Sequence, residues 1–94
     1  METSIVRARA VVRGRVQMVG FRAFVQRRAV DASLRGTVRN RPDGTLEVVI
    51  QGPNGAVERM IGLLHDGPSH ARVDAVDVEY ESPHEELPLM TVTA

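Results

Sequence analysis

The stretch that decides the fold is LRGTVRNRPDGTLEVVIQ, residues 34–51, because it holds two strand patterns on either side of a tight turn. Residues 34–41 and 45–51 each place their apolar side chains mainly on one parity, as in strands that bury one face. Between them, RPDG at 41–44 supplies a proline that presets φ and a glycine that accepts positive φ. The positions that share a face are Leu34, Val38 and Asn40 in the first strand and Leu46, Val48 and Ile50 in the second. The pattern predicts an antiparallel hairpin.

Two elements are expected before the hairpin. Residues 5–13 alternate between apolar side chains and, mostly, arginines, which predicts a strand with one wet face. From Phe21 to about Ser33, apolar residues recur at steps of three and four, which predicts an amphipathic helix, and a loop over 14–20 joins the two elements. The apolar faces consist of Val6, Ala8, Ala10 and Val12 in the strand, and of Phe21, Phe24, Val25, Ala29 and Ala32 in the helix.

Three elements are expected after the hairpin. The segment 52–68, GPNGAVERMIGLLHDGP, predicts a second amphipathic helix, which Asn54 or a neighbour is expected to cap and which the final glycine and proline end. Residues 72–81 alternate again and predict a strand, and LMTVT at 89–93 predicts a short edge strand. The apolar faces consist of Val57, Met60, Ile61 and Leu64 in the helix, and of Val76, Val78 and Tyr80 in the strand.

The order strand, helix, strand, strand, helix, strand predicts an α+β fold of the ferredoxin-like βαββαβ type. Two right-handed βαβ units of this order interleave into one four-stranded antiparallel sheet with both helices on one face. The C-terminal segment is expected to add a possible short fifth strand. Because 94 residues suit one compact domain, we expect residues 1–94 to form a single domain with its core at about 5–93.

Composition excludes several classes of protein. The chain has no cysteine, so disulfides, thiolate metal sites and a cysteine nucleophile are excluded. No segment has the apolar run of a signal peptide or of a membrane span, so a soluble, cytoplasmic protein is the expectation. The three histidines, His65, His70 and His84, lack the spacing of metal ligands, and no metal site is predicted.

Charge is balanced overall but unevenly distributed. Twelve basic and twelve acidic residues cancel, which argues against a general binder of nucleic acid or membrane surfaces. Ten arginines lie within residues 7–41, which indicates either a small anionic ligand or a polarised surface. The arginines expected to form a solvated basic surface are Arg7, Arg9, Arg13, Arg27, Arg28, Arg35 and Arg39. The acids expected on a wet strand face and beyond it are Asp74, Asp77, Glu79 and Glu81.

Residues 14–22, GRVQMVGFR, form the candidate binding segment. A loop that enters a helix presents unpaired N–H groups at the positive end of the helix dipole, where phosphate or carboxylate binds readily. Arg22, in the first helical turn, could clamp two oxygens with its planar guanidinium. Asn40, at the end of a strand, could accept a hydrogen bond from a water directed at a bound phosphorus. From these residues alone, a loop that only turns the chain and an asparagine that only forms a turn remain open alternatives.

Residues 14–22 together with GTVRNRPDGTLEVVIQG, residues 36–52, resemble the two signature segments of the acylphosphatases, and the resemblance extends over about residues 5–93. It implies hydrolysis of the carboxyl-phosphate bond of a small acyl phosphate to carboxylate and inorganic phosphate, with no metal or other cofactor. It also implies that Arg22 and Asn40 are catalytic and that inorganic phosphate inhibits. The backbone amides implied to bind the phosphoryl group belong to Arg15, Val16, Gln17, Met18, Val19 and Gly20.

Three residues depart from the family pattern. Met18 stands where the pattern has glycine, and if this position needs a positive φ, the methionine is strained by roughly 1–3 kcal/mol. Its side chain is also expected to crowd the phosphate or to reshape the mouth of the site. Thr37 replaces an aromatic residue, and Leu46 replaces a valine. Arg22 and Asn40 match the family pattern, so the interpretation of the protein as an enzyme is kept.

Other functions stay open at this point. A non-catalytic phosphate or anion-binding module has the same loop and would bind phosphate without turnover. An RNA-binding module of the same topology is disfavoured because the three aromatic residues, Phe21, Phe24 and Tyr80, do not line the central strands. A module of a larger maturation enzyme is disfavoured because the sequence ends just past the domain. We expect a monomer that binds neither nucleic acid nor membrane.

Overall fold

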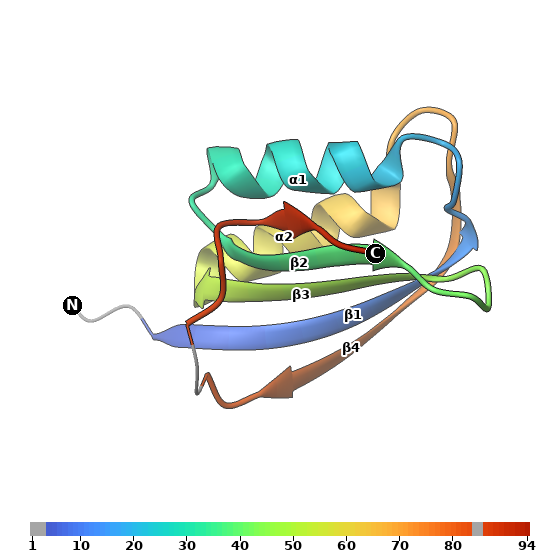
Figure 1. Ribbon diagram of the computed structural model, residues 1–94. Coiled ribbons are helices and arrows are strands. Elements are labelled where there is room, and N and C mark those ends of the chain that lie inside the picture. The colour runs from blue at the N-terminus through green and yellow to red at the C-terminus, as the bar shows by residue number, and fades with distance from the viewer. Residues whose placement is uncertain (1–3, 84–85) are drawn as a thin grey trace.

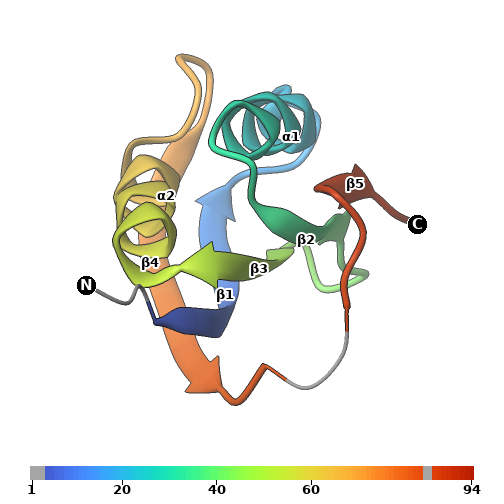
Figure 2. The same ribbon diagram turned by 90° about the vertical axis from the view of Figure 1, so that its left-hand side faces the viewer.

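The computed structural model describes residues 4–83 and 86–94, so the predicted surface position of His84 lies outside the described residues. The elements are β1 (Ile5–Arg15), α1 (Phe21–Asp31), β2 (Arg35–Asn40), β3 (Leu46–Pro53), α2 (Asn54–Asp66), β4 (Arg72–Glu81) and β5 (Thr91–Val92). One sheet contains all the strands in the order β4-β1-β3-β2-β5, and both helices cover the same face of it (Figures 1 and 2). The predicted ferredoxin-like fold is therefore confirmed.

The sheet is antiparallel from β4 to β2 and becomes mixed at one edge. The strand β5 pairs in parallel with β2, with Val38 opposite Val92, so the expected short C-terminal edge strand is present. No described helix has the length and apolarity needed to cross a membrane.

The central hairpin forms as its alternating pattern predicts. Strands β2 and β3 pair antiparallel, with Val38 opposite Val48 and Asn40 opposite Leu46. The turn closes with a hydrogen bond from Arg41 N to Thr45 O at 2.8 Å, and Gly44 adopts φ 91°, a conformation that favours glycine. The position of Asn40 is therefore fixed by the last pair of a regular ladder.

The core lies between the sheet and the two helices. Ala8, Ala10 and Val12 on the central strand β1 are fully buried, and these short side chains leave room for larger ones from the helices. The buried helical residues are Phe21, Val25 and Ala29 in α1, and Val57, Met60 and Leu64 in α2. Burial of these side chains fixes both helices on the sheet, and with them the start of α1.

The first strand is longer than predicted and takes up part of the expected loop. Gly14 lies inside β1, where the register with β4 shifts after Arg13. Its φ is 130°, and a Cβ atom there would collide with the carbonyl oxygen of Arg72. Gly14 therefore serves the close approach of two strands, and the loop that enters α1 is reduced to residues 16–20.

Three local predictions at the other elements are wrong. The helix α1 ends at Asp31, two residues early, and the chain leaves it through Ser33 at φ 58°. No side chain caps α2, whose N-cap position is Pro53, and Asn54 lies in the first turn with its amide 3.5 Å from Glu58 Oε1. Tyr80, expected to face inward, is 55% exposed because no helix covers that end of β4.

Four arginines of the uncovered sheet face are paired with acids, and the prediction of a solvated position is wrong for Arg7 alone. The bridges are Arg7–Glu81 at 2.8 Å, Arg13–Asp77 at 2.9 Å, Arg39–Glu47 at 2.9 Å and Arg9–Glu47 at 3.9 Å. Arg7 is 6% exposed and is thus buried rather than solvated. The arginines that have no carboxylate partner among the described residues include Arg15, Arg22, Arg27 and Arg28, so uncompensated positive charge gathers at α1 and the loop before it.

Gly36 and Gly62 give a matched test of the packing between β2 and β3. We expect Gly36→Ala to lower the free energy of unfolding by at least about 3 kcal/mol, because Gly36 has φ 147° and an added Cβ would collide with Val49 O. Gly62, in α2, has open space around it, so Gly62→Ala should raise stability by about 0.5–1 kcal/mol. Urea denaturation measures both changes. Wild-type stability in Gly36→Ala would contradict the described register.

Candidate functional site

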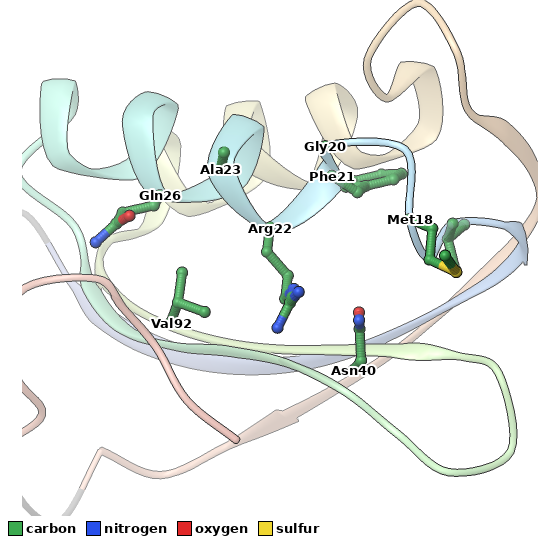
Figure 3. A pocket seen from close by; sticks show the side chains of 9 residues that line it. Met18, Gly20, Phe21, Arg22, Ala23, Gln26, Asn40 and Val92 are labelled. Carbon is green, nitrogen blue, oxygen red and sulfur yellow. The ribbon is translucent and has the colours of Figure 1, made fainter.

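A pocket of about 310 Å³ lies where α1 begins, above the end of β2 (Figure 3). Its lining consists of Val16, Met18, Gly20, Phe21, Arg22, Ala23, Gln26, Asn40 and Val92. The fold thus brings Arg22 and Asn40 together with alternate residues of the loop. Arg15, Gln17 and Val19, also predicted as site residues, are not among those that line the pocket, and Arg15 is the last residue of β1.

The loop is held against the hairpin by the side chain of Gln17. Its Nε2 donates to the carbonyl oxygens of Arg41 at 2.8 Å and of Thr45 at 3.0 Å, at the turn just beyond Asn40. Val16, 1% exposed, anchors the start of the loop in the core. Gln17 is therefore a positioning residue that sequence reasoning assigned only a backbone role, since its partners are 24 and 28 residues away.

The start of α1 leaves its N–H groups available to a ligand. Gly20 occupies the N-cap position at φ 80°, and no side chain accepts a hydrogen bond from the first turn. That turn contains no acidic residue either. Uncapped amides at the positive end of a helix favour an anion in front of them.

Arg22 adds a full positive charge to this end of the helix. Cations are disfavoured at a helix N-terminus by roughly 0.3–1 kcal/mol, and within the described ranges no carboxylate pairs with Arg22. Figure 3 shows its side chain extending from α1 toward the strand end that carries Asn40. Helix dipole and guanidinium therefore combine into a positive site that suits an anionic ligand.

Asn40 contributes a buried acceptor. Its Oδ1 is inaccessible to solvent and has no hydrogen-bond partner among the described residues. An unsatisfied buried acceptor costs about 1–3 kcal/mol, so a bound water or ligand donor would relieve a real penalty. The side chain rises from the end of β2 into the space between Arg22 and Met18 (Figure 3). This end of the pocket is thus suited to bind a group that donates a hydrogen bond.

Met18 lies in the left-handed region, so the condition for strain raised by the family glycine at this position is met. Its φ is 62°, where a residue with a Cβ atom is disfavoured by about 1–2 kcal/mol. The side chain is 99% exposed, so it stands at the rim and does not fill the cradle. This arrangement therefore does not favour the expected crowding of a phosphate by the Met18 side chain.

The far wall of the pocket comes from the C-terminal strand, which sequence reasoning did not connect with the site. Val92 of β5 lines the pocket beside Ala23 and Gln26 of α1. Gln26 Nε2 donates to Met90 O at 3.4 Å, and Met90 is 2% exposed, so β5 is anchored next to α1. A valine near a chain end carries no sequence signal for this role.

The described residues include no group of three or more His, Cys, Asp or Glu side chains arranged to hold a metal ion. His65 and His70 are exposed. The polar groups of the described pocket are the Arg22 guanidinium, backbone amides and the neutral carboxamides of Gln26 and Asn40.

Substitutions at Met18 and Gly20 are expected to change the free energy of unfolding in opposite directions, and so they test the backbone conformation of the loop. We expect Met18→Gly to raise the free energy of unfolding by about 0.5–1 kcal/mol, because relief of the positive φ exceeds the added chain entropy of glycine. Gly20→Ala should lower it by about 1 kcal/mol, since Gly20 also has positive φ and no neighbouring atom restricts the added Cβ. Urea denaturation of both variants measures the difference. Equal stabilities would show that the loop is not strained.

The turn that receives Gln17 is stabilised by Asp43. Its Oδ1 accepts hydrogen bonds from Thr45 Oγ1 at 2.6 Å and from Thr45 N at 3.0 Å. The Thr45 hydroxyl first, and then the Thr45 amide, lower the pKa of Asp43 from its ordinary 3.8, because both stabilise the ionised carboxylate. Arg41, with its guanidinium 3.8 Å from Asp43, acts in the same direction.

We expect Thr45→Val to raise the pKa of Asp43 toward its ordinary value, because the hydroxyl donor is lost. An NMR titration of the carboxyl carbon measures this, with Thr91→Val, whose hydroxyl bonds Leu89 O, as control. The folded-state pKa of Asp43 lies below the unfolded value, so its contribution to stability is present above about pH 4 and is lost as pH falls through the folded value. An unchanged pKa in Thr45→Val would contradict the assignment.

Comparison with known proteins identifies the family of the chain. The family model for acylphosphatases matches residues 8–88. Similar proteins include the acylphosphatase of a Roseiflexus species, 47% identical over 77 residues that cover 82% of this chain and 83% of the relative. The acylphosphatase of Thermococcus kodakarensis is 50% identical over 78 residues, 83% of this chain and 86% of that protein. The crystal structure of the Bacillus subtilis acylphosphatase matches with a TM-score of 0.91 at 32% identity, over 95% of this chain and 99% of that one. The chain belongs to the acylphosphatase family.

Proposed function

We propose that this acylphosphatase binds the phosphoryl group of its substrate with the amides of residues 15–20 and with Arg22, while Asn40 holds the attacking water. The observation that carries the proposal is one pocket that contains both the Arg22 guanidinium, which no described carboxylate pairs with, and the buried Oδ1 of Asn40, which no described group hydrogen-bonds. The Arg22 guanidinium is positively charged and suits the negatively charged phosphoryl oxygens. The second accepts a hydrogen bond from water and so directs a lone pair of that water at phosphorus.

The reaction needs positioning and charge stabilisation more than it needs a base. Water attacks phosphorus, the bond from phosphorus to the carboxylate oxygen breaks, and the carboxylate leaves with the bonding electron pair. Arg22 and the loop amides stabilise the charge on the equatorial phosphoryl oxygens as this happens. Asn40 is neutral and does not remove a proton at pH 7, so the water proton passes to the phosphoryl oxygens of the substrate. Fixing the water beside the phosphoryl group supplies much of the remaining acceleration.

Inorganic phosphate offers the same tetrahedral oxygens as the substrate, so we infer that it occupies the cradle as a product and a competitive inhibitor. A phosphate-binding module without turnover would share this geometry, and measured hydrolysis separates the two. A cytoplasmic location, a monomeric state and a single domain over residues 1–94 remain predictions from the sequence.

The central test is hydrolysis of benzoyl phosphate with EDTA present. We expect turnover by the wild type, unaffected by the chelator and competitively inhibited by phosphate. Arg22→Ala and Asn40→Ala should each lower kcat/KM by about 10²–10³-fold, the range for loss of one preorganised stabilising group. Arg28→Ala is the matched control, because Arg28 lies on the same helix with its guanidinium 5.3 Å from the Phe24 ring and does not line the pocket.

Full activity in Arg22→Ala or in Asn40→Ala would remove that residue from the mechanism. Phosphate binding without hydrolysis by the wild type would favour the non-catalytic module. An equal loss in Arg28→Ala would show that net charge, and not the position of Arg22, controls the rate.

A further inference from the structure

We propose that Met18 is an oxidation site at the mouth of the pocket, and that its sulfoxide weakens the binding of substrate and phosphate. The proposal rests on the proposed function, since it places the effect in the anion cradle. It goes beyond that function because it makes the affinity of the site dependent on peroxide.

The exposure of the sulfur-containing side chains singles out Met18. It is 99% exposed, whereas Met60 and Met90 are each 2% exposed within the core. The chain contains no cysteine, so Met18 carries the one solvent-accessible sulfur in residues 4–83 and 86–94. A dissolved peroxide reaches Met18 in the folded protein, while it reaches Met60 or Met90 only when the core opens.

The modification is a two-electron transfer of one oxygen atom. A lone pair of Met18 Sδ attacks one oxygen of hydrogen peroxide, and the O–O bond breaks. The hydrogen on the transferred oxygen moves to the departing hydroxide, which leaves as water. The sulfide is oxidised to the sulfoxide and the peroxide is reduced, and sulfoxide reductases can reverse the change.

The location of the new oxygen determines the effect. A thioether is a weak hydrogen-bond acceptor, whereas a sulfoxide oxygen is a strong one with partial negative charge. Met18 borders the same pocket as Arg22 and Asn40 (Figure 3), and in the described chain no carboxylate already pairs with Arg22. The partial negative charge of the sulfoxide oxygen at the mouth of the pocket therefore repels the phosphoryl oxygens of an anion that enters it.

The expected effect is a rise of about three- to tenfold in KM and in the inhibition constant of phosphate, the size of one new polar repulsion at the mouth of the pocket. The thermal midpoint should stay unchanged, because a side chain that is 99% exposed contributes little packing. A structural lesion at Met60 or Met90 would instead lower that midpoint.

The test treats the purified protein with hydrogen peroxide until peptide mapping finds one added oxygen on Met18. Benzoyl phosphate kinetics, phosphate binding by calorimetry and thermal unfolding are then compared before and after treatment, and after repair by methionine sulfoxide reductases. Each variant is compared with its own untreated form. Met18→Leu keeps the other three methionines, and its KM after treatment should be nearly the same as its KM before treatment. In Met60→Leu, the KM should rise on treatment as much as it does in the wild type.

Complete oxidation of Met18 with unchanged KM and unchanged phosphate affinity would overturn the proposal. So would an equal rise in KM in peroxide-treated Met18→Leu, which would place the effect at another residue. If the untreated protein fails to hydrolyse benzoyl phosphate, the proposed function fails, and the calorimetric phosphate affinity still decides whether Met18 oxidation weakens the cradle.

Discussion

The site depends on the pair of hydrogen bonds that Gln17 donates to the turn between β2 and β3. These bonds hold the loop before α1 against the turn just beyond the end of β2, which carries Asn40. The sheet order makes the contact possible, since β1 and β2 both flank β3 and their ends meet at one side of the molecule (Figure 1). One neutral side chain thus joins the loop proposed to bind the phosphoryl group to the residue proposed to hold the water.

Electrostatics divides the molecule into a neutralised face and a positive site. On the uncovered sheet face, arginines pair with acids on neighbouring strands, as in Arg13–Asp77 and Arg39–Glu47. Such exposed pairs contribute little stability each, but they cancel charge over most of the sheet. Among the described residues, Arg15 just before α1 and Arg22, Arg27 and Arg28 along it have no carboxylate partner, so a neutral chain still presents a local positive field to an anionic substrate.

Much of the fold was predictable because its signals are local. The alternation in residues 34–51 predicts the hairpin, and the glycine at position 44 predicts its turn. The role of Gly14 was not predictable, because the strand that approaches it lies some 58 positions further along, at Arg72. The burial of Arg7 was equally hidden, since an arginine on an alternating strand normally indicates solvent.

For the site, the residue types were predictable and their assembly was not. Arg22 and Asn40 could be named from motif spacing, and a positive φ at Met18 was anticipated from the glycine it replaces. The anchoring by Gln17 and the wall formed by Val92 depend on contacts between distant segments, which a linear pattern does not record. The prediction for α2 failed for the opposite reason. Asn54 is a good local candidate for a helix cap, but no side chain caps α2 in the structure.

The pocket is assembled from three segments, at residues 16–26, at Asn40 and at Val92, which span most of the chain. The last of these belongs to a two-residue strand that pairs in parallel with β2 across a sequence separation of more than fifty residues. Closing contacts between segments so far apart costs more loop entropy than closing local ones. The wall at Val92 therefore depends on pairing between two distant segments, whereas the hairpin that carries Asn40 is a local structure.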